Sequence, residues 1–147
     1  MDYKEQIKRA NENNAFMIHN GVRAVELSET AARVEMDPEK TSLNSMGGVH
    51  AGLMFLMAEA AAGLLVRNDG RTCVTIDSSF RFLRSAGPSE SLYAEARVKK
   101  GDGPYLSAIP EFMEGIPGSC LQRGILRFSV RRGEAVRRPG GARTGPS

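Results

Sequence analysis

Three side chains able to do acid–base or hydrogen-bonding chemistry lie in, or shortly before, the most apolar stretch of the chain. Asn44 comes six residues before His50, and Glu59 comes nine residues after it. Residues 53–66 are apolar or small except for Glu59. A carboxylate in such surroundings is costly to bury without compensation, and buried carboxylates are candidates for acid–base or nucleophilic work. Glu59 is therefore the first candidate catalytic residue; the alternative is that it simply faces water.

Residues 51–67 are expected to form a single helix that is buried on most of its sides. They are apolar nearly all the way round, and a turn-forming Asn-Asp-Gly sequence follows them. The start of a helix presents backbone N–H groups without partners and the positive end of the helix dipole. The N–H of Ala51 or of Gly52 is therefore able to polarise a carbonyl oxygen, as an oxyanion hole does.

Glu59 and the start of this helix cannot serve one site within a single chain. They are eight residues apart, which is roughly 12 Å along a helix axis. A reacting carbonyl must lie about 3 Å from both groups. In a two-fold dimer, the helix start of one subunit is able to face Glu59 of the other. The sequence therefore predicts that an active site of this kind requires a homodimer.

The elements around the central helix are mostly strands. A short helix and a two-stranded hairpin come before it, and four antiparallel strands come after it. The expected ranges are residues 2–14 for the short helix, 22–27 and 32–36 for the hairpin, and 72–83, 92–98, 105–113 and 120–130 for the later strands. Runs of strands with one long helix predict a single α+β domain at residues 1–130, with a curved antiparallel sheet wrapped around the helix.

The strand expected at residues 72–83 has a period of two. Its apolar and polar residues alternate, and the two sets are Val74, Ile76, Phe80 and Phe82 against Thr75, Asp77, Ser79 and Arg81. This alternation predicts that each set occupies one face of the strand. In a later strand, Pro110 indicates an edge position or a bulge. An apolar patch at residues 16–18 is expected to lie before a turn.

Composition excludes several classes of protein. Cys73 and Cys120 are in no CxxC spacing, which indicates reduced thiols in a cytoplasmic protein and no zinc site. No signal peptide or membrane-spanning segment is expected. Residues 131–147 hold five arginines against one glutamate, so this tail carries +4 and residues 1–130 carry −1. Partners such as nucleic acid and membrane are therefore not expected, and the Gly/Pro-rich tail at 131–147 is expected to be disordered.

Together these residues resemble a known signature. Asn44, the run Gly48-Val49-His50-Ala51-Gly52 and the pair Ala58-Glu59 are similar to the motif of hotdog-fold acyl-CoA thioesterases, of the phenylacetate-pathway and 4-hydroxybenzoyl-CoA types. Those families have Asn or Gln six residues before a His-Gly-Gly and an Asp or Glu nine residues after the His. Residues 75–84 are similar to the family's central strand. Ala51 stands where the family has its first glycine.

The resemblance implies a hotdog dimer, often paired into a homotetramer, with acyl-CoA sites at the dimer interface and no cofactor or metal. It assigns Glu59 the role of nucleophile or general base, and the Ala51 N–H the role of polarising the thioester carbonyl. Asn44 would orient water or the carboxylate, His50 would hold the loop, and Thr75 would help to position the attacking group. Arg81 and Arg84 are candidates for binding the CoA phosphates, and Met46, Met54 and Met57 are candidates for lining the acyl pocket.

Two other functions remain open at this stage. A hotdog domain that binds acyl-CoA as a sensor or carrier partner would bind the ester without turning it over. A hotdog dehydratase would pair a His with an acid on the same reacting carbons, and the spacing of His50 and Glu59 resembles the thioesterase arrangement better. The main hypothesis is a thioesterase acting on a small, medium-chain or aromatic acyl-CoA, with water as the second substrate.

Overall fold

The structure is a computed structural model of the chain, and it describes residues 2–88, 91–99, 105–114 and 120–130. Three helices and six strands run along the described chain, with a short 3-10 turn at Lys40–Ser42. In chain order they are α1 Tyr3–Asn13, α2 Ala15–His19, β1 Arg23–Leu27, β2 Ala31–Met36, α3 Ala51–Val66, β3 Cys73–Phe82, β4 Leu92–Lys99, β5 Tyr105–Glu114 and β6 Cys120–Val130.

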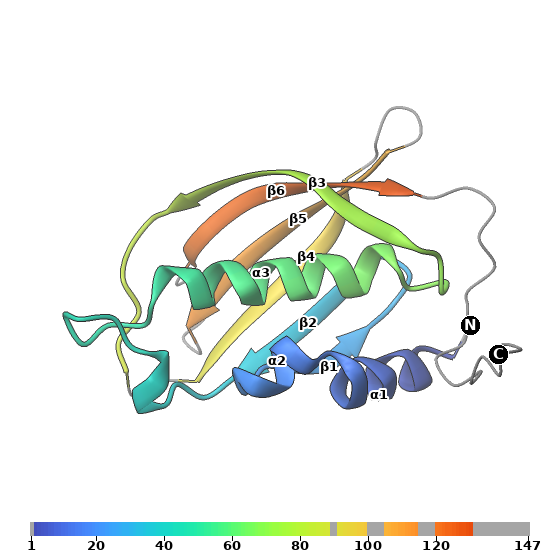
Figure 1. The fold of residues 1–147 in the computed structure, drawn as a ribbon. Coiled ribbons are helices and arrows are strands. Elements are labelled where there is room, and N and C mark those ends of the chain that lie inside the picture. The colour runs from blue at the N-terminus through green and yellow to red at the C-terminus, as the bar shows by residue number, and fades with distance from the viewer. Residues whose placement is uncertain (1, 89–90, 100–104, 115–119, 131–147) are drawn as a thin grey trace, which may run out of the picture.

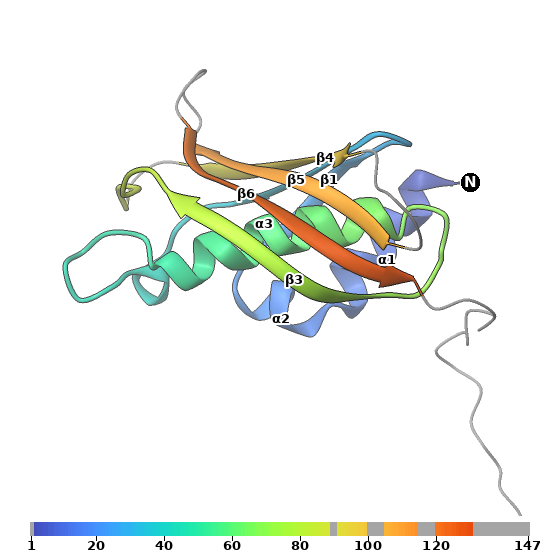
Figure 2. The same cartoon turned by 90° about the horizontal axis from the view of Figure 1, so that it is seen from above.

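The six strands form one antiparallel sheet in the order β1-β2-β4-β5-β6-β3. The sheet curves around α3, with α1 and α2 beside one side of the helix and β3 along the other (Figures 1 and 2). The expected α+β architecture, a curved antiparallel sheet around one long helix, is confirmed. The tail at residues 131–147 and its expected disorder lie outside the described residues.

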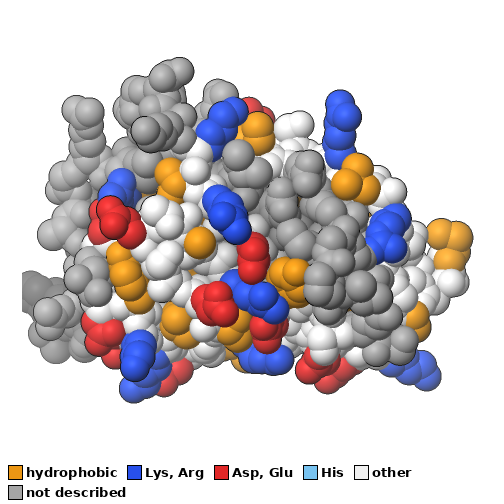
Figure 3. Space-filling model, turned by 180° about the vertical axis from the view of Figure 1, so that it is seen from behind, with side chains coloured by type: hydrophobic (Ala, Val, Ile, Leu, Met, Phe, Trp, Pro, Cys, Tyr) orange, Lys and Arg blue, Asp and Glu red, His pale blue; other side chains and the backbone are white. Residues whose placement is uncertain are grey.

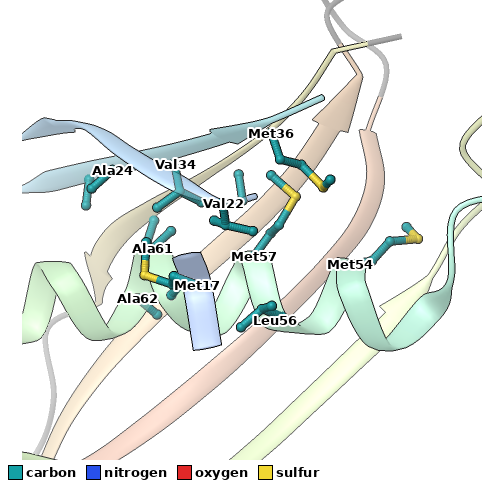
Figure 4. Close-up of a cluster of buried hydrophobic side chains, with 14 of the residues drawn as sticks. Met17, Val22, Ala24, Val34, Met36, Met54, Leu56, Met57, Ala61 and Ala62 are labelled. Carbon is teal, nitrogen blue, oxygen red and sulfur yellow. The ribbon is translucent and has the colours of Figure 1, made fainter. Parts of the chain in front are cut away.

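The core lies between α3 and the sheet. Met57, Ala61 and Ala62 of α3 are fully buried, and Figure 4 shows side chains from α2, α3, β1 and β2 meeting in one cluster. The apolar residues 16–18 come just before a turn at residues 20–21, as expected, and they lie within the short helix α2. Asn14 caps that helix through its side chain, and Met17 enters the core while its neighbours stay exposed.

One face of the sheet points away from α3 and is polar. On this face Arg33 forms ion pairs with Glu35 and Glu95, and its guanidinium lies 3.9 Å from the centre of the Tyr93 ring. Basic and acidic side chains are interspersed there (Figure 3). Because pairs of this kind neutralise one another, the helix side of the sheet is the better candidate for a functional site. No helix among the described residues is long and apolar enough to cross a membrane.

Strand β3 is the last strand of the sheet and differs from the rest. One of its edges pairs with β6, and the other edge has no neighbouring strand among the described residues; most of its side chains are exposed. A bulge between Thr75 and Asp77 places Ile76 opposite no residue of β6. A bulge of this kind reverses the alternation of a strand because one extra residue is inserted.

The bulge corrects the faces expected from the alternation. Opposed residues of an antiparallel pair lie on the same face of the sheet. Thr75 is opposite the buried Phe128, and Ser78 is opposite the buried Leu126, so both face α3. Phe80 also faces α3, whereas Val74 lies on the other face. An uninterrupted period of two predicts that Val74 and Phe80 share one face. In the structure they lie on opposite faces.

Candidate active site

The turn that leads into α3 is fixed by Asn44. Its Oδ1 accepts hydrogen bonds from the backbone N–H groups of Met46 at 2.9 Å and Gly48 at 3.2 Å. Gly47 has a φ of +84°, in the left-handed region that favours glycine. Asn44 is thus a turn residue through its oxygen, while its Nδ2 group makes no hydrogen bond within the described part of the chain. That amide group is free to donate to a ligand.

His50 is the N-cap of α3. Its Nδ1 accepts a hydrogen bond of 2.8 Å from the backbone N–H of Gly52. A Cβ at Gly52 would lie 3.0 Å from this Nδ1, so a larger residue would push the ring away from its capping position. The bond requires Nδ1 without a proton, so the neutral ring carries its proton on Nε2. His50 therefore holds the loop and the helix start together.

This cap separates the two candidate oxyanion donors. The Gly52 N–H is already bonded to His50, whereas the Ala51 N–H has no acceptor among the described residues. Ala51 is exposed and has a negative φ, because no residue other than glycine has a positive one in the described chain. Alanine at this position therefore keeps the helical geometry and the free N–H, and the backbone there does not need the positive φ that favours glycine.

Glu59 is half-buried in the middle of α3, on the side that faces β3. Its Oε1 accepts a hydrogen bond of 3.3 Å from the hydroxyl of Thr75. The bulge in β3 turns Thr75 toward the helix, so the pairing of these two side chains depends on it. A hydroxyl that donates to one carboxylate oxygen restricts the rotation of the group and leaves the other oxygen able to accept a proton.

The side of α3 that carries Glu59 is open. Phe55, one turn before Glu59, packs edge-to-face against Phe80 of β3 with ring centres 5.0 Å apart. Beyond this contact, Phe82 is 51% exposed and Ile76 is 49% exposed. Carboxylate and hydroxyl thus lie beside exposed apolar surface, an arrangement suited to a ligand or to a second copy of the chain.

Other candidates lie elsewhere or remain apart. Arg81 and Arg84 lie at and just beyond the exposed end of β3, and Arg81 is opposite Arg123 on the face away from α3. No described contact brings either arginine to Glu59. The methionines expected to line an acyl pocket do not act as a set, because Met54 and Met57 are core residues and Met46 is 89% exposed at the turn.

Two residues that sequence reasoning did not select lie next to Glu59. Arg67, the C-cap of α3, folds its side chain back along the helix over Gly63. Its Nη1 donates a hydrogen bond of 3.3 Å to the backbone oxygen of Cys73. Arg67 follows Glu59 by eight residues and Gly63 by four. That i, i+4, i+8 spacing was visible in the sequence as one helix face.

Cys73 is not suited to act as the nucleophile. It is buried, and burial raises the pKa of its thiol, although the charges of Arg67 and Arg71 act in the opposite direction. Since the thiolate is the reactive form, a raised pKa weakens the nucleophile at neutral pH. Among the candidates with described side chains, Glu59 is therefore the better placed to begin a reaction.

Comparison with solved structures defines the fold. The chain superposes on the PaaI protein from the phenylacetic acid degradation operon of Escherichia coli with a TM-score of 0.82, at 20% identity, over 89% of this chain and 94% of the other. A conserved protein of Pseudomonas aeruginosa gives 0.76 at 21% identity, over 87% and 98%. A hypothetical thioesterase of Streptococcus pneumoniae, solved with coenzyme A, gives 0.69 at 18% identity, over 88% and 94%. The chain has the hotdog fold.

Comparison of sequences also finds thioesterases and esterases. Residues 46–102 match the model of the thioesterase superfamily, and this segment contains His50, Glu59 and Thr75. A stretch of 75 residues is 33% identical to a putative esterase of Archaeoglobus fulgidus, over 51% of this chain and 49% of that protein. The chain thus spans about half the length of this relative. The resemblance to hotdog-fold thioesterases is confirmed by the superfamily match together with the fold.

Proposed function

We propose that the protein is an acyl-CoA thioesterase that hydrolyses its substrate to a free acid and coenzyme A. One observation carries the proposal: the Glu59 carboxylate is held by Thr75 on the open side of α3, in a hotdog fold whose matched segment is that of the thioesterase superfamily. Carboxylate, helix N–H and water are sufficient for acyl transfer to water.

The reaction is addition followed by elimination at the thioester carbonyl. Glu59 takes a proton from a water molecule while the oxygen of that water attacks the carbonyl carbon. The tetrahedral intermediate carries its negative charge on the former carbonyl oxygen, which accepts a hydrogen bond from a free helix N–H. The C–S bond then breaks, the thiolate of coenzyme A leaves and takes up a proton, and the acid is released. Direct attack by the Glu59 carboxylate, giving an anhydride that water opens, remains the other route.

The N–H in this scheme comes from a second subunit. Within one chain, Ala51 and Glu59 are separated by two turns of α3, roughly 12 Å along its axis. In a two-fold dimer, the partner subunit's Ala51 is able to approach Glu59 across the interface. The free Ala51 N–H and the occupied Gly52 N–H support Ala51 as the donor. Asn44 donates from its free Nδ2 to the attacking water or to the carboxylate.

The surface for that dimer is the β3 side of the molecule. A ten-residue edge strand with unpaired backbone groups is an aggregation hazard unless something covers it. Val74, Ile76 and Phe82 expose apolar surface beside that edge. Two copies related by a two-fold axis would pair their β3 strands, cover these side chains and place both Glu59 sites at the interface. Sedimentation analysis tests the dimer and the expected homotetramer together.

Release of free thiol from aliphatic and aromatic acyl-CoA esters tests the activity. We expect turnover by the intact protein and a loss of about 10²- to 10⁴-fold in Glu59→Ala, the range for removal of a general base. Glu29→Ala, an exposed carboxylate in the β1–β2 turn, is the matched control and should keep full activity. Binding of the esters without turnover by the intact protein would instead support the sensor or carrier hypothesis. Unchanged turnover in Glu59→Ala would exclude Glu59 as the catalytic carboxylate.

A further inference from the structure

A glycine in the middle of α3 leaves room for an arginine. Gly63 has ordinary helical geometry, since it is not among the described glycines with positive φ, so the backbone does not require glycine there. Glycine is unfavourable inside a helix compared with alanine. A Cβ at Gly63 would overlap the Nη2 atom of Arg67, and the same point lies 3.7 Å from the Oε1 atom of Glu59. The missing side chain therefore lets the guanidinium of Arg67 approach the candidate catalytic carboxylate.

Arg67 is a cation without a carboxylate partner among the described residues. Its Nη1 is bonded to a backbone oxygen, and no hydrogen bond from Nη2 to a described group is present. The nearby arginines differ, because Arg9 pairs with Glu5 at 3.5 Å and Arg71 pairs with Asp69. A half-buried guanidinium with unused donors is suited to bind an anionic oxygen.

Arg67 also lines a cavity of about 520 Å³ between the helices α1 and α2 and the second half of α3. The apolar lining comes from both sides and includes Ala10, Met17, Ala60 and Leu64. The polar lining includes three arginines and no aspartate or glutamate from the described residues. Its size lies within the range of sites for small ligands. Two of these arginines have carboxylate partners, and only Arg67 has none among the described residues. Apolar walls with one such cation at the rim are suited to a short carbon chain that ends in an anion.

We propose that the acyl group runs from Glu59 past Gly63 toward this cavity and that Arg67, which lines the cavity, binds a carboxylate at the end of the acyl group, so that the substrates are acyl-CoA esters of short dicarboxylic acids. This inference rests on the proposed thioesterase function. The Nη2 atom of Arg67 and the Oε1 atom of Glu59 both lie close to the position that a Cβ at Gly63 would occupy, so the two atoms are near each other. A chain of a few carbons therefore spans from a carbonyl next to Glu59 to the guanidinium. Arg67 acts as a specificity-determining residue, whereas Glu59 acts on the thioester.

The test compares esters of equal carbon number with and without a terminal carboxylate. Succinyl-CoA is matched with butyryl-CoA, and glutaryl-CoA with pentanoyl-CoA, and thiol release gives kcat and KM for each. We expect kcat/KM of the full-length protein to be at least about tenfold higher for the dicarboxylic member of a pair, the effect of one hydrogen bond to a charged group. Equal values for both members of both pairs would overturn the inference.

Two variants locate that preference. Arg67→Met should remove it, mainly by raising KM for the dicarboxylic ester, and leave the neutral ester within about threefold of its original value. Gly63→Ala should do the same, because the new methyl group displaces the guanidinium, while the helix gains a better helix former and the protein stays folded. Arg97→Met, which removes an exposed charge from the outer face of β4, is the control and should keep the preference. A preference that survives in both Arg67→Met and Gly63→Ala would contradict the proposal.

The outcome also separates this inference from the proposed function. Hydrolysis of neutral and dicarboxylic esters at equal rates would overturn the role of Arg67 and leave the thioesterase standing. If the protein hydrolyses no ester at all, the thioesterase proposal fails. Calorimetric titration with succinyl-CoA and butyryl-CoA then measures the preference directly. Tighter binding of succinyl-CoA that is lost in Arg67→Met would support the site, and equal binding would overturn it.

Discussion

The two sides of α3 differ in how completely they are covered. On one side, α2 places Met17 in the core at 3% exposure, next to buried residues of α3 and of the β1–β2 hairpin. On the other side, β3 leaves Ile76 and Phe82 about half exposed, and Glu59 lies in the gap between helix and strand. The covered side holds core residues and, beside them, the cavity that Arg67 lines. The open side has the surface of an interface or a binding site and carries the candidate chemistry.

This difference indicates where stability and function reside. A helix that is apolar nearly all the way round must be covered on every side, but within one chain the side of α3 that carries Glu59 is only partly covered. That side has a carboxylate, a hydroxyl and aromatic rings. Changes on the covered side should therefore lower the free energy of unfolding, and changes on the open side should alter assembly and turnover.

Ile76→Lys should have the largest effect. A lysine in the centre of the expected β3–β3 interface loses hydration without a partner, and the two-fold axis introduces it twice, so the dimer should weaken by about a thousandfold or more. Thiol release should be lost with it. Ile18→Lys on α2 is a matched control, because Ile18 and Ile76 are both 49% exposed. Sedimentation equilibrium measures the dimer, and equal dissociation of the two variants would place the interface elsewhere.

Met17→Ala should lower stability and leave assembly intact. Removing a buried methionine side chain leaves a cavity and costs about 2–5 kcal/mol in the free energy of unfolding. Phe16→Ala is the neighbouring control, since Phe16 is 64% exposed and should change stability by less than about 0.5 kcal/mol. Urea denaturation measures both. A similar loss in the two variants would mean that α2 is held by contacts other than Met17.

Thr75→Val should reduce turnover moderately. The substitution keeps the shape of the side chain and removes its hydrogen bond to Glu59, worth about 1 kcal/mol, so kcat/KM should fall by about fivefold. Thr75→Ser restores the hydroxyl and should recover most of the activity. If valine and serine give the same rate, the hydroxyl has no part in positioning Glu59.

His50→Ala should have the smallest effect on turnover. Loss of the N-cap should lower the free energy of unfolding by about 1 kcal/mol. Because the ring only holds the loop, turnover should fall by less than it does in Thr75→Val. His50→Asn supplies another capping side chain and should restore stability. A fall in kcat comparable with that of Glu59→Ala would show that His50 takes part in the chemistry.

Much of the fold can be predicted from the periodic spacing of apolar residues in the sequence. The range expected for α3, residues 51–67, differs from the observed Ala51–Val66 by one residue. The four later strands are also found where the alternation predicts them. These elements depend on burial with a regular period, which a linear sequence records directly. The curved antiparallel sheet around one helix follows from their order, and the hotdog fold that the resemblance implies is confirmed.

The features that the sequence did not predict depend on single contacts, which leave no periodic pattern in the sequence. The bulge at Ile76 is hidden because apolar residues stand at even positions on both sides of it, at Val74 before it and at Phe80 and Phe82 after it. The cap from His50 to Gly52 decides which N–H is free, and only side-chain geometry reveals it. The return of Arg67 over Gly63 likewise depends on a rotamer. The candidate residues Asn44, His50 and Glu59 are at the expected spacing, whereas their catalytic roles stay predictions.

The central claim is that each active site takes Glu59 from one subunit and the Ala51 N–H from the other. Ala51→Pro removes that N–H at the first helical position, where proline is favourable, and the extended His50 before it, with ψ of 134°, is compatible with proline. Ala51→Pro and Glu59→Gln should each be inactive as homodimers. Coexpressed and purified as a mixed dimer, they should recover about half of the wild-type thiol release, because one of the two sites is intact. A mixed dimer without activity, together with an active dimer of wild type and the doubly substituted chain, would contradict the account.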